Sequence, residues 1–179
     1  MPHAGRVRQA LREATMANHE RVDAIFSHFS LDTRKGYSAF LKAHARALPP
    51  LEALARPGSP RLPQLVQDLE ALGEFLPAPL LMPTQAGEPF RWGALYALEG
   101  SRLGGAMLER RVAPGLPRAY LSAVHDRGGW IAFQQSLDEA ADGGGEDWIN
   151  GAVQGAEAAF ALFAAGAQAE QTDVADGAA

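Results

Sequence analysis

The sequence has 179 residues, a mass of 19.0 kDa, a net charge of −5 and a mean hydropathy of −0.14. Its length suits one domain, and it has neither an apolar run near the roughly 18 residues of a membrane span nor a visible secretory signal. Because it contains no cysteine, disulfides, thiolate metal sites, iron–sulfur clusters and cysteine nucleophiles are excluded, and a cytoplasmic location is expected. The net negative charge disfavours a general nucleic-acid binder.

The first half of the chain indicates helices, because Ala, Leu, Glu, Gln and Arg are common in it and β-branched residues are sparse. Apolar residues at helical spacing predict a first helix over Arg6 to Phe26. Asp32 or Thr33 can cap a second helix, which Pro49-Pro50 ends or kinks. A third helix is predicted to begin near Pro63.

Prolines and glycines divide the second half of the chain. A loop precedes Pro89, and the predicted helices that follow cover about 89–111, 118–125, 128–141 and 146–165. Residues 168–179 are small and polar, so we expect a disordered tail there. The expected architecture is a single all-α helical bundle over residues 1–167.

Charge is distributed unevenly along the chain. Residues 1–61 hold 10 Lys and Arg against 5 Asp and Glu, whereas residues 114–179 hold 2 against 10. This gradient fits unevenly charged solvated faces, or a basic region that meets an anionic ligand or an acidic partner protein.

The predicted fourth helix contains an unusual number of glycines. Gly93, Gly100, Gly104 and Gly105 interrupt the run from Trp92 to Leu108, and each costs roughly 1 kcal/mol against Ala inside a helix. Gly100 and Gly104 are four apart and therefore share a face. A face without Cβ atoms allows close approach either by a neighbouring helix or by a flat ligand, and it permits a kink.

His19 is the second candidate of interest. It lies on or beside the apolar stripe of the first helix, where an imidazole is either a core residue or a metal or axial haem ligand. No acidic residue stands three positions before any histidine, so the Glu-x-x-His pairs of di-iron bundles are absent. Phosphate-binding loops, His-Glu-x-x-His motifs and nucleophile elbows are also absent from the sequence.

Two segments together resemble the haem oxygenase family. "LREATMANHE" is similar to the family's proximal-helix motif, which ends in the axial histidine, and "YALEGSRLGGAML" resembles its distal-helix motif in the bacterial form. "YSAFLKAHARALPPLE" and "GGWIAFQQSLD" resemble two further helices of the family. The resemblance covers about residues 6–165 and is nearest to bacteriophytochrome-associated members. It implies a haem-oxygenase-like helical bundle.

The resemblance also assigns roles to individual residues. It implies that His19 is the axial iron ligand, with Glu20 or another carboxylate as a possible acceptor for its second ring nitrogen. It makes Arg12, Tyr96 and Arg127 contacts of the haem propionates and Trp130 and Phe133 walls of the pocket. The distal, catalytic segment comprises Gly100, Ser101, Arg102, Gly104 and Gly105.

The reaction implied by the resemblance is cleavage of haem by O2 and electrons to biliverdin, CO and ferrous iron, with haem as both cofactor and substrate. The expected partner is an electron donor of ferredoxin or reductase type. Binding to nucleic acid or to a membrane is not expected, and the protein is expected to be a monomer. Ser101 stands where mammalian members carry a distal acid, and His44 is a further candidate for organising distal water. Met16 replaces a basic residue found in some members.

Three other functions are compatible with parts of this pattern. The first is a haem-binding or haem-sensing protein of the same fold without turnover. The second is a thiaminase-type relative, which the absence of cysteine disfavours. The third is a structural bundle in which His19 and the glycines only pack.

Overall fold

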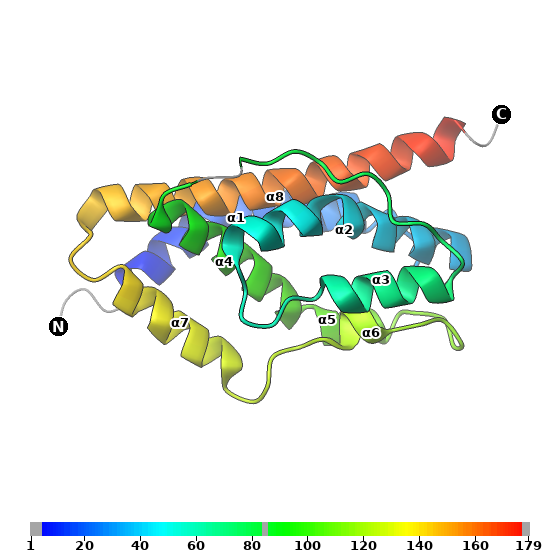
Figure 1. The fold of residues 1–179 in the computed structure, drawn as a ribbon, viewed down its shortest axis with the longest axis horizontal. Coiled ribbons are helices and arrows are strands. Elements are labelled where there is room, and N and C mark those ends of the chain that lie inside the picture. The colour runs from blue at the N-terminus through cyan, green and yellow to red at the C-terminus, as the bar shows by residue number, and fades with distance from the viewer. Residues whose placement is uncertain (1–4, 84–85, 177–179) are drawn as a thin grey trace.

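The computed structural model describes residues 5–83 and 86–176. Within these ranges all regular structure is helical, as the sequence predicts (Figure 1). The helices are α1 (Arg6–Phe26), α2 (Arg34–Ala55), α3 (Leu62–Ala71), α4 (Glu88–Leu103), α5 (Gly105–Glu109), α6 (Ala119–Ser122), α7 (Gly129–Ala140) and α8 (Gly145–Asp176). None of the described helices is both long enough and apolar enough to cross a membrane.

Helix α8 is the longest element and packs against α1, α2 and α4 (Figure 1). The crossing of α4 and α8 depends on glycine. A Cβ at Gly93 would lie 1.7 Å from the Ala152 carbonyl oxygen, and one at Gly155 would lie 1.9 Å from that of Phe90. Both positions therefore exclude any larger side chain, and Gly93 has a packing role.

Two apolar clusters form the core. The larger one joins α2, α3, α4, α6 and α8 around fully buried residues of α2 and α3 such as Leu48, Leu51 and Leu65. The smaller one joins α1, α4, α7 and α8 around Leu11 and Leu137. Burial of this apolar surface supplies the main driving force for the fold.

Helix α2 begins at the predicted cap, because the Thr33 hydroxyl accepts a hydrogen bond from the Gly36 amide at 3.1 Å. It continues through Pro49-Pro50 to Ala55 instead of ending there. Pro50 has no N–H for the Arg46 carbonyl four residues earlier. The Leu80 amide donates to that carbonyl at 2.8 Å, so a residue of the following loop replaces the missing helical partner.

The predicted fourth helix is broken at Gly104, where α4 ends and α5 begins. In a continuous helix the Gly104 amide would donate to the Gly100 carbonyl, but here it donates to the carbonyl of Arg102. The break therefore removes the usual partner of the Gly100 carbonyl. It is the kink that the glycine spacing indicated.

The last helix is longer than predicted. It extends from Gly145 to Asp176, so residues 168–176 are helical rather than a disordered tail; residues 177–179 lie outside the described part. Ala167 and Glu170 are buried in this extension, and Glu170 Oε1 accepts from Arg46 Nε at 2.6 Å. Composition misled the prediction because it does not reveal that α2 pairs with this segment.

Candidate active site

A cavity of about 470 Å³ opens between α1 and the glycine-rich end of α4, within the usual size range of small-molecule sites. Helices α2, α7 and α8 close its remaining sides. Its lining residues are Arg12, Thr15, Met16, His19, Glu20, Val22, Asp23, Phe26, Phe40, His44, Tyr96, Ala97, Gly100, Ser101, Leu103, Gly104, Leu108, Trp130, Phe160 and Phe163.

His19 projects from α1 into this cavity. Its Nδ1 lies 3.4 Å from Asp23 Oδ2, one helical turn further along, and its ring meets the ring of Phe160 edge-on with 6.0 Å between centroids. With Nδ1 directed to a carboxylate, Nε2 is the nitrogen available to a metal ion. Asp23 is the carboxylate beside the His19 ring, and sequence reasoning missed it although its i, i+4 spacing could have revealed it.

Gly100 and Gly104 are the two distal glycines that face open space. A Cβ at Gly100 would meet only the Trp130 ring, at 3.8 Å, and one at Gly104 would meet only the Ser101 carbonyl oxygen, at 4.0 Å. Among the described residues no other atom comes within 4 Å of these two Cβ positions apart from the glycines' own surroundings in the helix, so close packing does not explain the glycines. At Gly105, in contrast, a Cβ would lie 2.6 Å from the Leu121 carbonyl oxygen, which gives that glycine a packing role and places it outside the cavity lining.

Arg12, Tyr96 and Trp130 gather at one side of the cavity. Burial raises the pKa of the Tyr96 phenol, and the nearby Arg12 cation opposes that shift. The Trp130 ring lies 5.9 Å from that of Tyr96. The group combines a cation, a neutral phenol and an aromatic face, which suits an anionic group on a flat ligand.

His44 lines the cavity among aromatic side chains, with ring centroids 4.6 Å from Phe40 and 4.7 Å from Phe26. Burial, with a smaller contribution from the Arg61 cation, lowers the pKa of His44 to about 3. Its Nδ1 lies 2.8 Å from the Tyr120 hydroxyl. Burial also raises the Tyr120 pKa, so the phenol and the imidazole are both neutral, and the His44 tautomer decides which of the two donates.

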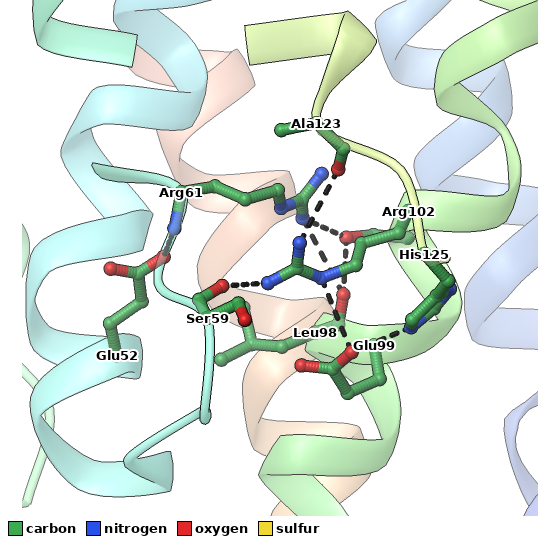
Figure 2. A network of polar contacts seen from close by, with 9 residues as sticks. Glu52, Ser59, Arg61, Leu98, Glu99, Arg102, Ala123 and His125 are labelled. Carbon is green, nitrogen blue, oxygen red and sulfur yellow. Dashed lines mark hydrogen bonds and ion pairs between the residues drawn. The ribbon is translucent and has the colours of Figure 1, made fainter. Parts of the chain in front are cut away.

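Behind α4 lies a buried polar network (Figure 2). Glu99 Oε2 lies 3.2 Å from Arg102 Nε and 2.6 Å from His125 Nε2. The Arg102 guanidinium also contacts the carbonyls of Ser59 and Ala123. These contacts fasten the loop before α7 and the turn before α3 to the distal helix, and they direct the Arg102 side chain away from the cavity.

The structure brings seven of the predicted site residues together in the cavity lining: Arg12, His19, Tyr96, Gly100, Ser101, Gly104 and Trp130. It does not bring Arg102, Gly105, Arg127 or Phe133 there. Arg127 is exposed on the loop before α7, and Phe133 supports Trp130 from behind with 5.5 Å between ring centroids. The sequence did not predict that four phenylalanines would line the cavity, because they come from three separate helices. They are Phe26, Phe40, Phe160 and Phe163.

Within the described residues, no group of three or more His, Asp or Glu side chains could hold a bare metal ion. A single histidine opposite a Cβ-free helix instead fits a flat macrocycle that brings its own equatorial metal ligands. Fold and site therefore define an all-helical protein with a ligand pocket between α1 and the glycine-rich end of α4.

Comparisons with known proteins agree with this class. No family model matches the chain. It is 37% identical over 109 residues to a haem oxygenase of Xanthomonas campestris, and the match covers 58% of this chain and 64%, just under two thirds, of that protein. Its fold is similar to the NO- and CO-bound haem oxygenase from Neisseria meningitidis, with a TM-score of 0.78, 25% identity, and 92% of this chain and 91% of that chain covered. The chain is therefore similar in sequence and in fold to bacterial haem oxygenases.

Proposed function

We propose that this protein cleaves haem with O2 and reducing electrons to biliverdin, CO and ferrous iron. One observation carries the proposal: His19 on α1 lines the same cavity as Gly100 of α4 and Gly104 at its end, and a Cβ at either glycine would meet no protein atom closer than 3.8 Å. Glycine at Gly100 and Gly104 lowers helix stability, and no protein contact requires it there. A flat ligand against the bare backbone supplies the reason.

The residues present fit haem. His19 Nε2 would bind the iron, while Asp23 accepts from Nδ1–H and keeps the ring in one orientation. Arg12 and Tyr96 would hold the propionates by charge-assisted and phenolic hydrogen bonds. When bound, haem supplies both the iron that activates O2 and the carbon that is oxidised.

The chain's own residues would control water and protons on the distal side. The Gly100 carbonyl, released from its helical partner by the break at Gly104, can accept a hydrogen bond from an ordered water. The Ser101 hydroxyl and the His44 imidazole would supply further polar atoms near this water. The aromatic side chains of Phe26, Phe40 and Phe163 exclude bulk water from the deep end.

Electrons would come from a partner of ferredoxin or reductase type. The excess of Lys and Arg in residues 1–61, together with the exposure of Arg12 and Arg21 on α1, fits an acidic donor that docks beside the propionate edge. We propose that the protein acts as a monomer in the cytoplasm.

The test is a haemin titration followed by turnover in air. We expect a Soret band that forms at one equivalent, is lost or shifted in His19→Ala, and is replaced by biliverdin absorbance after addition of reductant. His28→Ala is the matched control, because His28 is exposed near the end of α1 and outside the cavity lining. A Soret band that persists under reductant and O2 would indicate haem binding without turnover.

A further inference from the structure

Arg61 is a buried cation on the far side of the distal helix. It stands at the N-cap of α3 with 4% of its surface exposed, and its backbone amide donates to Glu52 Oε1 at 2.7 Å. Its guanidinium contacts the Ser101 Oγ atom and the Leu98 carbonyl, the latter at 3.5 Å (Figure 2). It also lies over the face of the Tyr120 ring, 4.9 Å from the centroid.

No ion pair joins this guanidinium to a carboxylate anywhere in the described residues, whereas the neighbouring Arg102 is paired with Glu99. Removing a charge from water without a counterion is costly. The contacts with Leu98, Ser101 and Tyr120 offset only part of that cost, because two of the partners are neutral oxygens and the third is a ring. The Glu52 carboxylate, whose pKa burial raises and the Arg61 cation lowers, faces it from α2, whereas the direct contacts of the guanidinium toward α4 are with neutral oxygens.

Ser101 connects the Arg61 cation to the cavity. Ser101 lines the cavity, whereas Arg61 does not, and the Ser101 hydroxyl donates to the Leu98 carbonyl at 2.7 Å and accepts from Arg61. A hydroxyl whose oxygen is held by a guanidinium is a stronger donor, since hydrogen bonds in a chain polarise one another. By rotating from the Leu98 carbonyl, the same O–H can donate to a ligand in the cavity.

A second cavity residue also senses Arg61. Burial is the main cause of the lowered pKa of His44, and the Arg61 cation is the second cause. The same cation opposes the rise in the Tyr120 pKa that burial produces. Because His44 lines the same cavity, the positive potential of Arg61 reaches the distal space by two routes.

We propose that Arg61 is a positioning residue that makes the distal face of a bound haem selective for anionic axial ligands, acting through the Ser101 hydroxyl. The inference rests on the proposed function, because it requires haem in the cavity. A purely structural role would instead be to tie the turn before α3 to α4, without discrimination by ligand charge.

The experiment compares an anionic ligand with a neutral one on the haem complex. Azide is titrated against the ferric form and CO against the ferrous form, for the unmodified protein and for Arg61→Met, Arg61→Lys, Ser101→Ala and the Arg61→Met/Ser101→Ala double variant. Arg56→Met is the control, since that arginine has a side chain 69% exposed at the end of α2. The acid–alkaline transition of ferric haem is followed in the same samples.

We expect Arg61→Met to weaken azide binding about tenfold and CO binding less than about twofold. The pKa of the haem-bound water should rise by about one unit, because the bound hydroxide loses a favourable charge. Arg61→Lys should recover part of the azide affinity. Ser101→Ala should also weaken azide binding, and the double variant should lose less than the sum of the two single losses.

Unchanged azide affinity in Ser101→Ala overturns the inference even if Arg61→Met does not fold. Equal weakening of azide and CO, or additive losses in the double variant, overturns it as well. Absence of a His19-dependent Soret band in the unmodified protein is a different result, because it contradicts the proposed function itself.

Discussion

Asp23 Oδ2 lies 3.4 Å from His19 Nδ1 on the same face of α1. If His19 binds the haem iron, as proposed, the carboxylate that can orient its ring belongs to its own helix. Asp23→Asn should weaken haem binding about 10- to 100-fold, the usual effect of losing a partner of a metal-bound histidine. Haem titration with Soret detection measures the change.

Glu13→Gln is the matched control for this substitution. Glu13 is an exposed carboxylate on α1 that bonds Gln9 and does not line the cavity, so its haem affinity should equal that of the unmodified protein. Equal affinity for the Asp23→Asn variant would show that the contact with His19 does not position the imidazole.

The distal glycines should separate into two groups by their mutational effects. Gly104→Leu should leave the free energy of unfolding within about 1 kcal/mol of the original, because no protein atom obstructs the side chain. It should abolish turnover by covering the distal face. Gly93→Ala should lower the free energy of unfolding by about 1–3 kcal/mol or more, since its Cβ meets the Ala152 carbonyl oxygen at 1.7 Å.

Urea unfolding of the apoprotein and biliverdin formation by the haem complex measure the two effects separately. Near-normal turnover in Gly104→Leu would contradict a haem-facing role for that glycine. A Gly93→Ala protein as stable as the original would contradict the close crossing of α4 and α8.

The helical content and most helix bounds could be predicted from the sequence because amphipathic spacing is a local signal. Helix α1 begins at Arg6 and ends at Phe26, as predicted. The continuation of α2 past Pro50 was harder to predict. The Arg46 carbonyl, which lacks a partner in the helix because Pro50 has no N–H, accepts from the amide of Leu80, thirty positions after Pro50. The same limitation hid the helical state of residues 168–176, which depends on burial of Glu170 against Arg46.

In the candidate site, too, local features could be predicted from the sequence and features that depend on long-range packing could not. His19 and the Gly100–Gly104 pair stand out in the sequence, because unusual residues interrupt a regular apolar pattern. Arg61 does not stand out, since it follows a Gly-Ser-Pro turn in which an exposed arginine would be ordinary. Its burial becomes visible only when the turn before α3 is packed against α4 (Figure 2).

His44 should make the protein less stable in acid. Its pKa is lowered to about 3 in the folded state from an ordinary value near 6.5, so between these pH values the unfolded chain binds a proton that the folded chain does not. The free energy of unfolding therefore falls as the pH drops below about 6.5. By pH 4.5 this histidine should account for up to about 2–3 kcal/mol of the loss.

Urea unfolding of His44→Gln and the original protein at pH 7, 5.5 and 4.5 isolates this contribution, because other titrating groups are common to both. The stability difference between the two should shift in favour of the variant as the pH falls. In His28→Gln, which changes an exposed histidine, the difference should stay constant. A constant difference for His44→Gln as well would mean that His44 protonates without penalty in the fold.

Glu170 should stabilise the C-terminal part of α8. It is 4% exposed, and its Oε1 accepts from Arg46 Nε at 2.6 Å. Breaking a buried ion pair is costly because it removes the attraction that offsets the desolvation of the charges, so Glu170→Ala should lower the free energy of unfolding by about 2–4 kcal/mol. Glu157→Ala, an exposed substitution on the same helix, should change it by less than about 0.5 kcal/mol. Urea unfolding followed by circular dichroism measures both variants. Equal stability of the two would show that residues near 170 do not pack against α2 in solution.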